Sequence, residues 1–147
     1  MKKWFISFVL ALVAPLALAA SSVDVIKPYA RAVPPGQENS AMFMMLKNKS
    51  ARPVSLISAQ SSAADVVELH THTMANGVMQ MRQVSEINIP ANNHVSLQPG
   101  SFHIMLIGLK KQLKEGDKVS VKLHFSSGEM AIVEMPVKAV QMMKMKH

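Results

Sequence analysis

Histidine and methionine are concentrated in two short parts of this sequence. Between Leu69 and Arg82 the chain reads LHTHTMANGVMQMR, so two histidines and three methionines surround an Asn-Gly pair. Farther along, His103 and Met105 are separated by a single residue. Imidazole nitrogens and thioether sulfurs both bind metal ions, and thioethers select soft ones. These residue types predict a site for a soft metal ion, provided that the fold brings the two groups together.

The first group is predicted to form a β-hairpin, because Asn-Gly is the strongest short-range signal for a two-residue hairpin turn. A turn at Asn76-Gly77 would place Met74 opposite Met79. It would likewise place His72 opposite Met81. Side chains alternate between the two faces of a strand. One face of the hairpin then carries all of its histidines and methionines, namely His70, His72, Met74, Met79 and Met81.

The second group lies on a predicted strand over residues 102–109. His103 and Met105 are two residues apart, about 6.6 Å along a strand, and therefore share one face. The residues between and beside them, among them Ile104 and Leu106, would face the core. Two His–Met groups on strands can converge on one ion. The predicted ligand set is His70, Met81, His103 and Met105.

The donor set also selects the metal. Thioethers bind magnesium, calcium and zinc poorly, whereas imidazole and thioether together suit Cu(I), and Ag(I) by the same softness. A set without anionic ligands favours Cu(I) over Cu(II). The chain has no cysteine, which excludes thiolate zinc, iron–sulfur and blue-copper sites. Methionine can replace cysteine as a sulfur ligand in an oxidising compartment because it forms no disulfide, although sulfoxidation would inactivate it.

Other histidines and methionines have simpler explanations. Methionine often fills gaps in cores, and five methionines in strongly apolar segments are predicted to pack there: Met42, Met44, Met45, Met130 and Met135. His94 and His124 fall on the polar faces of predicted strands and are expected at the surface.

Ten short segments have the composition of strands and are separated by turn signals. They cover residues 23–32, 40–48, 54–58, 66–73, 78–84, 87–90, 95–97, 102–109, 118–125 and 129–137. This spacing predicts an all-β fold, a Greek-key sandwich or barrel, formed by one domain over residues 21–138. Residues 139–147 have no strand pattern and are expected to form a flexible tail that contains methionine and histidine.

Residues 1–20 are predicted to be a cleaved signal peptide. Two lysines precede an apolar run over residues 4–18, and Ala17-Leu18-Ala19 fits the small-residue cleavage pattern. Cleavage after Ala20 fits nearly as well. An uncleaved membrane anchor is the alternative, but the run is shorter than the roughly 20 residues of a spanning helix. The mature protein is therefore expected to have no membrane span.

The charge does not favour a nucleic-acid partner. The formal net charge is +7, and removal of Lys2 and Lys3 would lower it to +5. Nucleic-acid-binding proteins usually carry a basic stripe with stacking residues, whereas aromatic residues make up only 5% of this chain. The sequence also contains no Gly-x-Ser-x-Gly or His-Glu-x-x-His motif, so it does not favour an enzyme.

At the predicted ligands the sequence resembles the periplasmic copper-chaperone family PCu(A)C. The hallmark of that family is a histidine, a methionine eleven residues later and a His-x-Met twenty-two residues after that; His70, Met81, His103 and Met105 meet this spacing. The similarity extends over nearly all of residues 23–137. It includes VELH (67–70), GVMQMR (77–82), HIMLIGLK (103–110) and LKEGD (113–117).

This resemblance implies a cupredoxin-like β-barrel that holds Cu(I) near its surface with the same four residues. It also implies a periplasmic carrier that passes copper to a thioredoxin-like copper assembly factor or to cytochrome oxidase subunit II. A copper-buffering or resistance protein that sequesters the ion without dedicated delivery is the alternative function.

Two features depart from or extend the family pattern. Family members often have methionine near position 72, where this chain has His72. That histidine could supplement or replace His70, or help to bind Cu(II). The tail resembles the C-terminal extensions of some members and is hypothesised to be a second, weaker copper site, with a solvated end as the alternative. Its donors are Met142, Met143, Met145 and His147.

Overall fold

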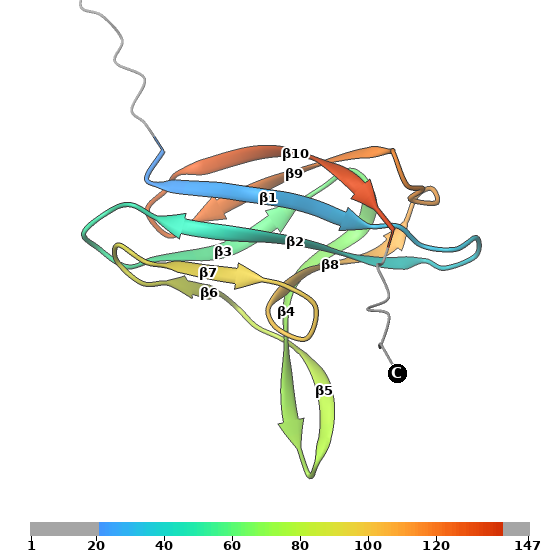
Figure 1. Ribbon diagram of the computed structural model, residues 1–147, viewed down its shortest axis with the longest axis horizontal. Helices are drawn as coiled ribbons and strands as arrows, with labels where there is room; N and C mark the ends of the chain where they lie inside the picture. Colours follow the sequence, from blue (N-terminus) through green and yellow to red (C-terminus); the bar gives the residue numbers. More distant parts are fainter. Residues whose placement is uncertain (1–20, 140–147) are drawn as a thin grey trace, which may run out of the picture.

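The structure is a computed structural model that describes residues 21–139, which form ten β-strands (Figure 1). The strands are β1 (Val23–Arg31), β2 (Asn39–Asn48), β3 (Val54–Gln60), β4 (Ala64–Ala75), β5 (Val78–Gln83), β6 (Ile87–Ile89), β7 (His94–Leu97), β8 (His103–Leu109), β9 (Lys118–Phe125) and β10 (Met130–Lys138). Every predicted strand is present, and no strand begins or ends more than two residues from its predicted position. The predicted signal peptide and residues 140–147 of the predicted tail lie outside the described residues. Nothing within the described range forms a helix long and apolar enough to cross a membrane.

The strands form one continuous sheet that folds back on itself into two layers. Their order is β5-β4-β8-β2-β1-β10-β9-β3-β6, and β7 pairs with β2 in addition. The layers are joined by a parallel pairing between β1 and β10, in which Ala30 lies beside Val137. The other pairings are antiparallel. The predicted all-β, single-domain fold is therefore confirmed.

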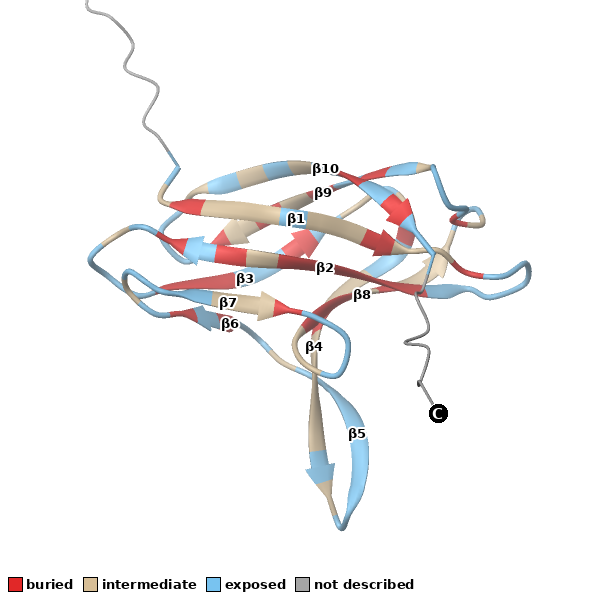
Figure 2. Cartoon of the chain, viewed as in Figure 1, coloured by how far each residue is buried: buried red, intermediate tan, exposed pale blue. Residues whose placement is uncertain are grey.

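Period-two burial shows how the sequence builds the core between these layers. Along β9, Val119, Val121, Leu123 and Phe125 are buried, whereas the side chains between them are not. Such alternation is typical of strands with one face on the core and one toward water. β2 instead is buried without interruption from Ser40 to Met44, and the burial colouring shows it as the most buried of the front strands (Figure 2). This strand pairs with β8, the strand that carries His103 and Met105.

β8 lies between β2 and β4, and this position brings the two His–Met groups together. β4 pairs with β8 only as far as His70, which lies opposite His103. Beyond that residue β4 continues with β5 alone, and the two strands leave the body as a projecting hairpin (Figure 1). The base of this hairpin is therefore the place where His70, His72 and Met81 meet His103 and Met105.

The core assignment of the methionines is partly wrong. Met42, Met44 and Met135 are buried as predicted, but Met45 is only half-buried and Met130 is 61% exposed. Met130 shares its face of β10 with Ile132, and both point away from the core because the buried positions of this strand have the opposite parity. An apolar local sequence did not reveal which face the strand presents to the core. The prediction for His94 is confirmed, while His124 is half-buried.

Candidate metal centre

The turn of the projecting hairpin sets the register of its donors. Asn76 and Gly77 have φ angles of 51° and 76°, and positive φ at both central residues is the requirement of a type I′ turn. Met74 accordingly lies opposite Met79, and His72 lies opposite Met81. The positive φ at position 77 favours glycine, because residues with a Cβ rarely adopt it. The predicted register of the hairpin is therefore confirmed.

A cavity of about 130 Å³ lies at the base of the hairpin. Three of the four predicted ligands, Met81, His103 and Met105, line it together. His72 also lines this cavity, whereas His70 does not. The residues of the two groups thus meet at one place, and the residue that departs from the family pattern is among them.

The three imidazole rings are close to one another. The ring centre of His103 lies 5.2 Å from that of His72 and 5.8 Å from that of His70. Each ring has one buried nitrogen without a hydrogen-bond partner, namely Nδ1 of His70, Nδ1 of His72 and Nε2 of His103. Buried polar atoms are nearly always paired in proteins, so an unpaired one calls for an explanation. Two of these atoms belong to residues that line the cavity, His72 and His103, and a metal ion bound there would be their missing partner.

His103 is built to present Nε2 to the cavity. Its side chain is 2% exposed, and its Nδ1–H donates to the carbonyl oxygen of Ser101 at 3.0 Å. Because that bond fixes the proton on Nδ1, Nε2 keeps its lone pair. Burial lowers the pKa of His103 below its usual value; the Ser101 hydrogen bond opposes this shift, and electrostatic repulsion from the neighbouring His72 and His70 rings and from Arg31 adds to it. The ring is therefore neutral at neutral pH, which is the state that binds metal.

His70 is oriented by a carboxylate. Its Nε2–H donates to Oε2 of Glu68 at 2.7 Å, which leaves Nδ1 with the lone pair. Metal-binding histidines almost always donate their other ring nitrogen to a carboxylate or a carbonyl. His70 and His103 each show one of these two arrangements. This feature supports His70 as a ligand even though the cavity is lined by His72.

Glu68 gives a direct test of that orientation. Glu68→Ala is expected to lower the Cu(I) affinity by about 10- to 100-fold, the usual effect of removing an outer partner of a metal ligand. A competition titration against a chromophoric Cu(I) chelator measures this affinity. Glu134→Ala is the matched control, because Glu134 pairs with Lys118 on the outer face of β10 and should leave copper binding unchanged. Equal affinities of the two variants would contradict the role of Glu68.

The sulfur donors are more accessible than the nitrogens. Met81 is 47% exposed, and Met105 is half-buried opposite Ala41 of β2. Among residues 21–139, no three His, Asp or Glu side chains are arranged to hold a metal ion by themselves. Met81 and Met105 line the cavity together with His72 and His103, and thioether donors favour a soft ion.

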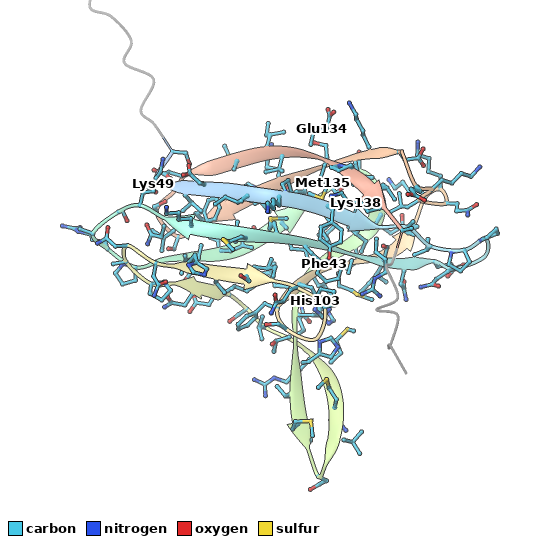
Figure 3. The ribbon with its side chains drawn as sticks, viewed as in Figure 1. Phe43, Lys49, His103, Glu134, Met135 and Lys138 are labelled. Atoms are coloured by element: carbon cyan, nitrogen blue, oxygen red, sulfur yellow. The ribbon has the colours of Figure 1, made fainter. Side chains whose placement is uncertain are left out.

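Several residues of the site have no signal in the sequence as donors. Arg31 and Phe43 line the cavity beside His103, and Figure 3 shows Phe43 next to His103 where the hairpin leaves the body. The guanidinium carbon of Arg31 lies 5.3 Å from the centre of the Phe43 ring. Glu68 could have been found from the sequence, because it shares a strand face with His70 and is two residues away.

Comparison with known proteins extends these findings. Residues 23–137 match the family model "Putative lipoprotein LpqE-like". "Putative lipoprotein Lxx21020" of Leifsonia xyli subsp. xyli is 39% identical over 120 residues, which cover 81% of this chain and 71% of that protein. The solution structure of CuI-DR1885 from Deinococcus radiodurans is 35% identical, with a TM-score of 0.64 and coverage of 82% of this chain and 83% of that one.

A third likeness concerns the fold alone. The apo PCuAC domain from PmoF1 is 18% identical, with a TM-score of 0.70 and coverage of 82% of this chain and 96% of that domain. These neighbours confirm the cupredoxin-like fold. With a family model that spans most of the chain, they establish that this protein belongs to the LpqE-like family, which is the PCu(A)C family.

Proposed function

We propose that this protein is a periplasmic copper chaperone that holds Cu(I) and delivers it for assembly of the copper centre of cytochrome oxidase. The observation that carries this proposal is the meeting of three unpartnered ring nitrogens and two thioether side chains at the base of one hairpin. It agrees with the copper-bound state of the Deinococcus radiodurans relative. The protein is a carrier and not an enzyme, since the ion is its cargo.

In this proposal, His70, Met81, His103 and Met105 bind Cu(I). The two nitrogens are Nδ1 of His70 and Nε2 of His103, which their hydrogen bonds to Glu68 and Ser101 leave free. All four ligands are neutral, and Arg31 adds a positive charge beside the cavity. A divalent ion would be repelled more strongly than a monovalent one, so the site favours Cu(I).

His72 adds a third imidazole next to this set. Cu(II) prefers nitrogen and oxygen donors in a tetragonal arrangement, and His72 lies within ring contact of His103. We assign to His72 the role of retaining copper that becomes oxidised in the site. The C-terminal tail, which lies outside the described residues, is retained as a proposed second site for Cu(II).

Neutral ligands at an accessible site also suit transfer. Met81 is nearly half exposed, so an incoming ligand of a partner can replace it while the other ligands still hold the ion. Such stepwise exchange needs no large change of the fold. The proposed recipients are cytochrome oxidase subunit II and a thioredoxin-like assembly factor. A signal peptide at residues 1–20 would place the chaperone in their compartment, and the lipoprotein name of the Leifsonia relative agrees with export.

X-ray absorption at the copper edge tests the site itself. Protein loaded with one equivalent of copper under reducing conditions is expected to contain Cu(I) with both sulfur and nitrogen neighbours. Oxidation should replace sulfur by nitrogen or oxygen, because His72 becomes a ligand. A spectrum with no sulfur neighbours in the Cu(I) form would overturn the proposed set.

A transfer experiment separates delivery from buffering. Mixing the Cu(I)-loaded protein with the copper-free soluble domain of cytochrome oxidase subunit II is expected to move copper to that domain, as measured after separating the two proteins. Retention of the copper, under conditions where a small chelator of similar affinity can remove it, would favour the buffering alternative.

A further inference from the structure

The tip of the projecting hairpin carries two more methionines, which the ligand set does not use. Met74 and Met79 lie directly opposite each other, and their exposed fractions are 66% and 58%. Facing residues of an antiparallel pair have Cβ atoms about 4.5–5.5 Å apart. Two long, flexible thioether side chains at that spacing can bind one ion between their sulfurs.

Within residues 21–139, no other strand covers this pair. β5 is the last strand in the sheet order and pairs only with β4, and all six of its residues are exposed. The hairpin extends away from the body of the protein, and its outer strand is solvent-exposed along its length (Figures 1 and 2). Met74 and Met79 are therefore accessible to an ion or to a donor molecule, and both are more exposed than Met81 of the cavity.

The pair is also aligned with the inner site. Met74–Met79 and His72–Met81 are two residues apart along both strands, so they share one face of the hairpin and the same type of cross-strand pairing. Successive pairs are therefore about 6.6 Å apart along the strands, and the next pair position brings in His70 opposite His103 through β8. Soft donors thus follow one another from the tip to the cavity.

We propose that Met74 and Met79 form an outer Cu(I) site that captures the ion and passes it inward to the cavity; this inference rests on the proposed function. Cu(I) first binds the two outer sulfurs. A bond from copper to the sulfur of Met81 then forms as the bond to one outer thioether breaks, and the second outer bond breaks when His103 binds. No electron or proton is transferred, and the single positive charge moves with the ion. The direction follows from ligand number, because two thioethers hold Cu(I) less tightly than the four-ligand site.

The rate of copper uptake tests this proposal. Cu(I) is supplied as its bicinchoninate complex, and the loss of that colour is followed by stopped flow. In the double variant Met74→Leu/Met79→Leu, which removes both sulfurs and keeps the apolar bulk, we expect uptake about tenfold slower, because the ion is no longer held next to the cavity at a raised effective concentration. The equilibrium affinity of the inner site should not change. Met130→Leu is the matched control, because Met130 is equally exposed but lies on β10.

The uptake rates of these variants decide whether Met74 and Met79 form an outer Cu(I) site. Uptake at the native rate in the double variant, or an equal loss in Met130→Leu, would overturn the outer site. A normal rate with leucine but a slow rate with Met74→Ser/Met79→Ser would also overturn it, since the tip would then act as an apolar contact for the chelate. If the native protein did not bind one equivalent of Cu(I), the proposed function would be rejected instead. The uptake rates of the tip variants do not test that function, because these variants keep the inner site.

Discussion

His103→Ala is expected to lower the affinity for Cu(I) by more than about 100-fold, because loss of a ligand should exceed the 10- to 100-fold effect of losing a ligand's outer partner. His103 has a central place in the site. Its ring lies near the rings of His70 and His72, and its unpaired Nε2 is buried at the cavity. The affinity is measured by competition with a Cu(I) chelator of known strength.

Two further variants make that result specific. Met105→Leu keeps the size of a half-buried side chain while removing its sulfur, and it should also weaken binding strongly. His94→Ala removes an exposed histidine on β7 and should have no effect. Thermal unfolding of the copper-free proteins checks that each variant is folded. Native-like affinity in folded His103→Ala and Met105→Leu would contradict the assignment of these two ligands.

Phe43→Ala is expected to reduce the free energy of unfolding by about 3–5 kcal/mol, the usual cost of removing a buried phenylalanine. Phe43 is 2% exposed on the central strand β2. Its ring lies 5.2 Å from that of Tyr29 and 6.3 Å from that of His103, measured between centres. The variant should also bind Cu(I) more weakly, because the His103 ring would lose the surface that limits its motion. Urea unfolding and the chelator titration measure the two effects.

Phe125→Ala separates stability from binding. Phe125 is equally buried in the core but belongs to β9 in the other layer and does not line the cavity. We expect this variant to lose a similar free energy of unfolding. Its affinity for Cu(I), measured on folded protein, should not change. A Phe43→Ala protein with native stability, or one that binds copper no worse than Phe125→Ala, would contradict the role of Phe43 as a support of the site.

The sequence predicted the local structure of the site well, because strong local rules govern it. Asn76-Gly77 fixed the hairpin register, and period-two alternation predicted the shared faces from which Met81, His103 and Met105 reach one cavity. Those rules do not determine which strands become neighbours. The pairing of β8 with both β4 and β2, which brings His103 to His70, depends on packing between distant parts of the chain. Here the spacing of the PCu(A)C motif supplied what alternation could not.

The remaining differences have the same origin. Met130 was expected in the core from its apolar neighbours, but the parity of β10 is set by its pairing with β9 and places this residue outside. The cavity residues Arg31 and Phe43 come from strands that supply no predicted ligand, and they enter the site only through the fold. The choice between His70 and His72 likewise depends on ring orientation and on Glu68, which spacing along the chain does not encode.

The parallel pairing of β1 with β10 has a consequence for how the protein reaches this state. It joins Ala30 to Val137, so the contact that unites the two layers links segments from opposite ends of the described chain. Contacts of long sequence separation slow folding, because the chain must lose much of its freedom before they form. A chain that emerges from its N-terminal end therefore holds β1 without one of its two neighbouring strands until β10 has appeared. Copper offered before that moment meets methionines and histidines on strands that have not yet been assembled into a site.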